Sequence, residues 1–250
     1  MIANMFHQTV VELKALKCIE RHLESKELCT KNAVNNHVLK RGGWCLTPGN
    51  TDSITWNKYT FMLPQHHVPA SGRIASELVT FIEQENITSI NDFGAGVGQF
   101  KHASLSKLPD VEWSSYDGAG NTEEYMQGFV HFADLTLPLE LPKADWVVSL
   151  EVGEHVPGNY EEMVIHNLHI HNCRGVILSW AVLGQEGHSH VNNHSNDYIT
   201  SLFKELGYKE DLLLKDKLRN STDNYFYLQW SSDELIHLPV WFVLARTPLN

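Results

Sequence analysis

Three residues that can exchange protons or bind a metal ion stand close together at positions 151 to 155. Glu151, Glu154 and His155 occupy positions i, i+3 and i+4 of the segment SLEVGEHVP. A helical turn would place the three side chains on one face. Two carboxylates and an imidazole so arranged suit a divalent metal ion or a general base. Because the chain has 15 histidines, a chance cluster that only shapes a turn is the alternative.

A glycine-rich loop follows an apolar segment over residues 87–93. The segment ends in Asp92 and Phe93, and the glycines after it have the spacing G-x-G-x-G. Glycine lets the backbone approach a ligand closely, and the N-terminus of a following helix offers free N–H groups. Dinucleotide-binding proteins use G-x-G-x-x-G, and Gln99 stands where their third glycine would fall. A nicotinamide-dependent oxidoreductase is therefore the weaker alternative.

A second acidic residue closes the next expected strand, over residues 111–117. Asp117 is followed by Gly118 and comes shortly after the glycine loop. A carboxylate at such a strand tip can accept hydrogen bonds from ribose hydroxyls. Asp-Gly is also a common turn pair, which is the alternative interpretation. In combination with the glycine loop, the spacing favours binding of a nucleoside.

These residues need a scaffold that brings several strand ends together. From Ser71, an expected helix N-cap, apolar strands and amphipathic helices alternate, which is typical of a doubly wound, mostly parallel sheet. We expect strands at 87–93, 111–117, 129–132, 144–150, 174–182 and 237–245, and helices at 71–86, 98–108, 161–172 and 195–207.

The string INDFGAGVGQF resembles motif I of the class I methyltransferases that use S-adenosylmethionine (SAM). This resemblance implies a Rossmann-like, seven-stranded α/β fold whose last strand is antiparallel. It also implies that the glycine loop lies against the amino-acid half of SAM, that Asp117 binds the ribose and that Asp134, in FADL, meets the adenine. The candidate cofactor-binding residues are Asp92, Gly94, Ala95, Gly96, Gly98, Asp117, Gly118, Asp134, Leu135 and Glu151.

The E-x-x-E-H pattern resembles two methyltransferase subgroups, those of ubiquinone synthesis and those that methylate the 2′-oxygen of small RNAs. There the acids and the histidine ligate a divalent metal, and the RNA subgroup adds a histidine from a later loop. In this chain the loop GHSHVNNH offers His190, or else His188. The resemblance implies Glu151, Glu154, His155 and His190 as metal ligands. It also makes Glu154, His155 and His190 the catalytic candidates for methyl transfer to oxygen, nitrogen or sulfur.

Residues 1–70 precede the part of the chain that carries the resemblance, which we expect to be a methyltransferase domain over residues 71–250. A helix is expected over residues 8–23, and loops, short helices and a turn over residues 29–65. Methyltransferases often cover the SAM site with such an N-terminal extension. Trp44, Tyr59, His66 and His67 are candidates to line this lid, although simple packing onto the core would equally explain the aromatic residues.

The amino-acid composition bears on the class of methyl acceptor and on the cell compartment. The formal net charge is -11 and no basic stripe is visible, so a small-molecule acceptor is expected ahead of a protein or RNA acceptor. Four scattered cysteines predict free thiols, and the absence of a signal-like or membrane-spanning run predicts a cytoplasmic protein without membrane contact. The sequence contains no pattern that indicates an oligomeric state. A catalytically silent SAM-binding scaffold is a further alternative.

Overall fold

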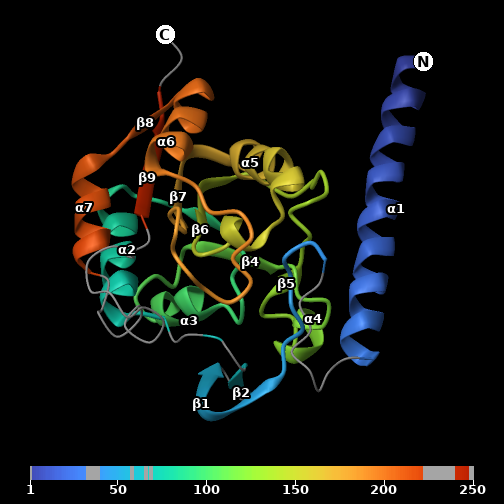
Figure 1. Cartoon of the computed structure of the whole chain (residues 1–250), viewed down its shortest axis with the longest axis horizontal. Helices are drawn as coiled ribbons and strands as arrows, with labels where there is room; N and C mark the ends of the chain where they lie inside the picture. The colour runs from blue at the N-terminus through green and yellow to red at the C-terminus, as the bar shows by residue number, and fades with distance from the viewer. Residues whose placement is uncertain are drawn as a thin grey trace.

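A single seven-stranded sheet forms the centre of the computed structural model, which describes residues 2–31, 40–56, 59–64, 67, 70–221 and 240–247. The strand order is β5-β4-β3-β6-β7-β9-β8 (Figure 1). The strands are β3 (Ser89–Phe93), β4 (Glu112–Asp117), β5 (His131–Phe132), β6 (Ala144–Ser149), β7 (Asn172–Trp180), β8 (Tyr208–Glu210) and β9 (Val240–Arg246).

The first five of these strands are parallel, so their carboxyl ends meet at one edge of the sheet. β9 lies between β7 and β8 and runs antiparallel to both. The expected α/β fold and its antiparallel last strand are therefore confirmed. Residues 237–239, where that strand was expected to begin, lie outside the described residues.

Helices cover both faces of the sheet, because successive strand residues point to opposite sides. On β7, Val176 and Leu178 join one core cluster, together with residues of α5 (Glu161–Ile170) and α6 (Asn196–Glu205). Ile177 joins the other cluster, with residues of α2 (Gly72–Gln84) and α7 (Leu212–Asn220). Shorter elements are α3 (Gln99–Leu105), α4 (Thr122–Tyr125) and the 3-10 turns η1 (Gly153–His155) and η2 (Gly158–Tyr160).

Helix boundaries follow local capping. The hydroxyl of Ser71 accepts a hydrogen bond from the N–H of Ile74, as the sequence predicts for an N-cap. Ser195 and Asp211 cap α6 and α7 in the same way. Among the described helices, none combines the length and apolar character needed to cross a membrane.

The N-terminal part contains α1 (Ile2–Lys31) and a β-hairpin, β1 (Pro48–Trp56) with β2 (Tyr59–Pro64). The prediction of loops and short helices over residues 29–65 is wrong for this hairpin. The β1 sequence PGNTDSITW lacks apolar alternation, so its strand character comes from pairing with β2. α1 is longer than the expected helix and lies along one side of the molecule (Figure 1). The division at residue 70 stays a prediction.

Two of the four cysteines are paired, which corrects the expectation of four free thiols. Cys29, in the last turn of α1, forms a disulfide with Cys45, and both are buried. Sequence spacing gave no sign of this pair because it depends on α1 running beside the segment that precedes β1. Cys18 and Cys173 are free.

Candidate functional site

The glycine loop turns sharply at the carboxyl end of β3. Gly94, Gly96 and Gly98 have φ of 75°, 58° and 70°, a region that residues with a Cβ rarely adopt. The N–H groups of residues 94 and 95 donate to the carbonyl of Tyr116 at 2.8 and 2.9 Å, which ties the loop to β4. A Cβ on Gly94 would lie 2.2 Å from Val152. Both backbone strain and collision therefore select glycine there.

Asp92 is buried at the base of this loop. Its carboxylate accepts hydrogen bonds from Trp113 Nε1 at 3.2 Å and from Ser115 Oγ at 3.4 Å, both on β4. Loss of water around the group raises the pKa of Asp92 to about 7. The side chain therefore joins β3 to β4 where the loop begins.

Asp117 holds the tip of β4 against the glycine loop. Its Oδ2 accepts from the N–H of Gly96 and its Oδ1 from the N–H of Ala119, each at 2.8 Å. Burial raises the pKa of Asp117 to about 6. Because each carboxylate oxygen can accept more than one hydrogen bond, the group retains capacity for a pair of vicinal hydroxyls.

Asp134, the third expected cofactor acid, is engaged by the N-terminal helix. Its Oδ2 accepts from Arg21 of α1 at 2.6 Å, while its Oδ1 accepts from the N–H of Thr136 at 2.8 Å and from the Thr136 hydroxyl at 2.6 Å. An adenine amino group would have to share these oxygens. Sequence reasoning missed Arg21, because nothing within α1 distinguishes it from a solvated arginine.

These strand ends border one cavity of about 310 Å³, a size within the range of small-molecule sites. Of the expected cofactor residues, all but one line it: Asp92, Gly94, Ala95, Gly96, Asp117, Gly118, Asp134, Leu135 and Glu151. Gly98 is instead packed under Phe129, where a Cβ would come within 2.8 Å of the ring.

Glu151 follows β6 in a constrained conformation. Its φ is 57°, which costs a residue with a Cβ roughly 1 to 2 kcal/mol. Ser179 on β7 stabilises this turn twice: its Oγ accepts from the N–H of Glu151 at 2.9 Å and donates to the Glu151 carboxylate at 2.6 Å. The turn brings the next residues of the E-x-x-E-H segment to the cavity.

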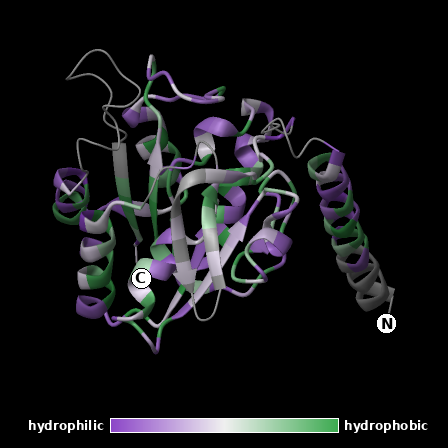
Figure 2. Ribbon diagram, turned by 90° about the horizontal axis from the view of Figure 1, so that it is seen from below, coloured by the Kyte–Doolittle hydropathy of each residue, from purple (hydrophilic) through white to green (hydrophobic). Residues whose placement is uncertain are grey.

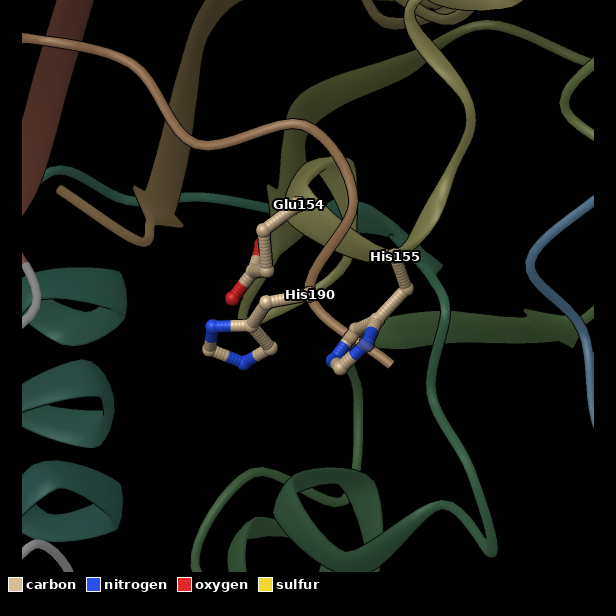
Figure 3. Close-up of side chains that lie close together, drawn as sticks. All are labelled: Glu154, His155 and His190. Atoms are coloured by element: carbon tan, nitrogen blue, oxygen red, sulfur yellow. The ribbon is translucent and has the colours of Figure 1, made fainter. Parts of the chain in front are cut away.

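Glu154, His155 and His190 come together from two segments, and Figure 3 shows them side by side. One ligand-capable atom from each lies within 4.8 Å of the other two. Glu151, the fourth expected ligand, is outside this group and is hydrogen-bonded to Ser179. His188 packs edge-on against Trp44 instead, with ring centroids 5.5 Å apart. The structure thus brings together three of the predicted residues.

Burial shifts the pKa values of Glu154, His155 and His190. Glu154 is 0% exposed, and within the described part of the chain neither of its oxygens has a hydrogen-bond partner of normal geometry. Burial, followed by the charge of Glu151, raises the pKa of Glu154 well above its usual value. Burial lowers the pKa of His155 to about 3 and also lowers that of His190. Neutral imidazoles beside an unsatisfied carboxyl are complementary to a cation or a proton donor.

The loop that carries His190 is anchored to the same segment. The N–H groups of Val191 and Asn192 both donate to the carbonyl of Glu154, at 2.8 and 3.0 Å. His190 Nδ1 lies 3.4 Å from the carbonyl oxygen of Gln185. If Nδ1 donates in that contact, Nε2 keeps its lone pair for a ligand.

A buried acid outside the cavity secures the other end of this loop. Glu161, at the start of α5, accepts hydrogen bonds from Asn192 Nδ2 at 2.8 Å, from His194 Nε2 and from the Tyr198 hydroxyl. His194 stacks on Tyr198 with ring centroids 4.1 Å apart. Sequence reasoning missed Glu161, since its partners are more than 30 positions away in the chain.

Part of the N-terminal segment lines the cavity, while its role as a lid stays a prediction. The ring of Trp44 meets His155 edge-on at 5.0 Å and His67 at 6.0 Å between centroids. Gly42 approaches so closely that a Cβ would lie 2.5 Å from the carbonyl oxygen of His155. Trp44 and His67 both line the cavity. The side chain of Tyr59 and all of His66, the other lid candidates, are outside what the structure describes.

No protein-family model matches the sequence, and no curated protein does. Solved structures resemble it. The methyltransferase domain of bacterial CtHen1-C aligns with a TM-score of 0.51 and 12% identity, over 71% of this chain and 98% of that chain. Magnesium protoporphyrin IX methyltransferase (ChlM) from Synechocystis PCC 6803, solved with bound SAM, gives 0.48 and 16%, over 70% and 79%. CalS10, an amino pentose methyltransferase from Micromonospora echinaspora with SAM bound, gives 0.49 and 11%, over 71% and 92%.

At these identities the comparisons establish the fold alone. The chain has the Rossmann-like sheet that SAM-dependent methyltransferases share.

Proposed function

We propose that this chain is a methyltransferase that moves the sulfonium methyl of SAM to an oxygen, nitrogen or sulfur atom of a small acceptor. One observation carries the proposal. The glycine loop, the Asp117 strand tip and the imidazoles of His155 and His190 all border the same cavity. A nucleoside bound by the glycine loop and Asp117 would therefore share this cavity with groups that can accept a proton.

The main task of the protein in methyl transfer is to align the acceptor atom with the methyl carbon of SAM. The acceptor atom attacks the methyl carbon, the carbon–sulfur bond breaks, and S-adenosylhomocysteine (SAH) leaves with the bonding electrons. Proximity and orientation supply most of the acceleration. The acceptor's proton passes to the imidazole of His155 or His190, both of which border the cavity. The lid residue Trp44 excludes water from that end of the cavity.

A divalent metal ion fits the same residues. Glu154, His155 and His190 each offer one ligand atom within 4.8 Å of the other two, and neither Glu154 oxygen makes a hydrogen bond of normal geometry among the described residues. Those three residues would hold the ion. When bound, it would act as a Lewis acid that makes an acceptor hydroxyl easier to deprotonate.

Binding of SAH and of nicotinamide dinucleotides, measured by calorimetry on the purified chain, tests the cofactor. We expect SAH to bind and Asp117→Ala to weaken it by about 10- to 100-fold, because a charged acceptor of hydrogen bonds is lost. Asp110→Ala, at an exposed loop acid, should leave the affinity unchanged. Tight binding of a dinucleotide without SAH binding would instead establish an oxidoreductase.

Transfer is tested separately with methyl-labelled SAM and a metabolite extract. We expect label to appear in a small molecule. Binding of SAH without transfer to metabolite, protein or RNA would identify a silent scaffold. Label found in RNA or protein would retain the reaction and change the acceptor class.

A further inference from the structure

The outer face of α1 carries large apolar side chains in contact with solvent. Leu13, Leu16, Ile19 and Leu23 are between 53% and 63% exposed. At 3.6 residues per turn they fall on one stripe of the helix. Figure 2 shows α1 standing beside the body of the molecule, with hydrophobic and hydrophilic residues interleaved along it.

This stripe cannot turn inward, because contacts of the opposite face fix the helix. Arg21 pairs with Asp134 at 2.6 Å, and the His22 ring stacks on Phe132 at 4.3 Å. The disulfide of Cys29 holds the last turn. The inner face of α1 is therefore held by ion-pair, ring and disulfide contacts. Four large apolar side chains stand among charged ones on its outer face, whereas a helix that packs only on its own chain turns such side chains inward.

We propose that the stripe binds the α1 helix of a second copy of this chain, antiparallel and around a twofold axis. An axis near Lys17 and Cys18 places Leu13 of one copy opposite Leu23 of the other, and Leu16 opposite Ile19. The apolar positions are thus self-complementary, as a twofold interface requires. A helix pair in a shallow left-handed crossing buries such a stripe along its length.

Charges beside the stripe favour the same arrangement. Lys17 and Glu20 are exposed, and no ion pair of either is found within the described residues. With the axis near Lys17, each copy's Lys17 comes beside Glu20 of the other copy, so the ion pair forms twice. A parallel pair in register would place like charges at the same height.

A membrane surface is the less favourable occupant. The exposed charges of α1 include Glu12, Glu20, Glu24 and Glu27, and the whole chain has a net charge of -11. Helices that lie on anionic lipid carry an excess of lysine and arginine beside their apolar face. Among the exposed charges of α1, these four glutamates outnumber the basic residues Lys17, Lys26 and Lys31, and such a mixture of charges suits pairing between two identical helices.

Sedimentation velocity of the purified full chain tests the proposal. We expect a dimer at micromolar concentration, and roughly a 100-fold or greater rise in the dimer dissociation constant for Leu16→Asp/Leu23→Asp. The matched control is Leu212→Asp/Leu213→Asp on α7, whose side chains are 61% and 71% exposed, and it should leave the dimer intact. Circular dichroism checks that each variant is folded.

Charge reversal tests the antiparallel register without disturbing the apolar stripe. Lys17→Glu and Glu20→Lys should each weaken the dimer by about tenfold, and the double variant should recover wild-type affinity. A wild-type monomer at all concentrations would overturn the proposal, as would a dimer that survives the loss of both leucines. A monomer that floats with phosphatidylcholine–phosphatidylserine vesicles would assign the stripe to a membrane instead. Failure of the double reversal would overturn the register.

Discussion

Asp92 has a substantial electrostatic penalty in the folded chain. Its pKa rises from 3.8 to about 7 because burial disfavours the charged form more than Trp113 and Ser115 stabilise it. The folded state therefore holds the proton more tightly than the unfolded state. The contribution of protonated Asp92 to the free energy of unfolding is therefore fully present below about pH 4 and is lost as the pH rises towards 7.

Asp92→Asn removes this titration while retaining an acceptor for the two hydrogen bonds. Between pH 4 and 7 we expect the stability of the wild type relative to the variant to fall by roughly 1.4 kcal/mol per pH unit. Urea unfolding of the unliganded chain at several pH values measures this difference. Parallel pH profiles for the two proteins would contradict the assignment of the shift to Asp92.

A substitution at Glu154 tests whether methyl transfer can be lost while cofactor binding is kept. Glu154→Gln keeps the shape of the side chain but removes a carboxyl that can ionise and bind a cation beside His155 and His190. We expect methyl transfer to fall by about 100-fold or more, while SAH affinity is unchanged. Calorimetry and label transfer are measured on the same preparation, and metal analysis of both proteins shows whether bound metal falls with activity. An equal loss of SAH affinity would place Glu154 in the cofactor site instead.

At this scale the sequence predicted residues whose partners are local. The glycine loop, Asp117 and the E-x-x-E-H segment are short patterns at strand ends, so their place in the cavity followed from the alternation of strands and helices. Arg21 escaped prediction because its partner Asp134 is 113 positions away. The choice of His190 over His188 likewise depends on how one loop folds over Glu154.

Among the elements, the segment that includes Trp44 depends on a covalent link to α1. The disulfide closes a loop with a sequence separation of 16 and fixes Cys45 beside the cavity lining. Cys45→Ser should lower the unfolding free energy by about 3 kcal/mol, and it should weaken SAH binding because Trp44 loses its anchor. Denaturant unfolding with and without reductant measures the effect. The control Cys173→Ser, at an exposed free thiol, should change neither quantity.

The loop that carries His190 should loosen when Glu161 is changed. Glu161→Gln weakens the hydrogen bonds to His194 and Tyr198, and we expect a loss of about 1 to 3 kcal/mol in local stability. Amide hydrogen exchange over residues 185–195 should quicken, with little change in the central strands. Glu162→Gln, the exposed neighbour, is the matched control. Equal exchange in both variants would show that the network does not hold the loop.

Elements with a clear apolar period were predictable, and polar ones were not. β6 and β7 contain continuous apolar runs, and the shorter β3 and β4 place apolar residues between polar ones. The structure has all four strands close to where the sequence placed them. β1 is polar and lacks apolar alternation, and neither β8 nor α7 was among the elements expected from the sequence. In both cases long-range pairing supplies the stability that local pattern lacks.

For the whole molecule, ligand binding should appear as global stability. If SAH binds only the folded chain, a concentration 100 times its dissociation constant adds about 2.7 kcal/mol. For a chain of this size we expect the melting temperature to rise by roughly 5 to 10 °C. Differential scanning calorimetry measures the shift, and Asp117→Ala should need proportionally more SAH to reach it. A flat melting temperature across the titration would contradict cofactor binding.

The position of β9 has a consequence for synthesis. This strand comes last among the described elements, yet it pairs with β7 on one side and β8 on the other. Until residues 240–246 leave the ribosome, β7 has an open apolar edge, and such edges pair readily with other nascent chains. A nascent chain that stalls before this point would therefore need a chaperone, even with every residue of the cavity already translated.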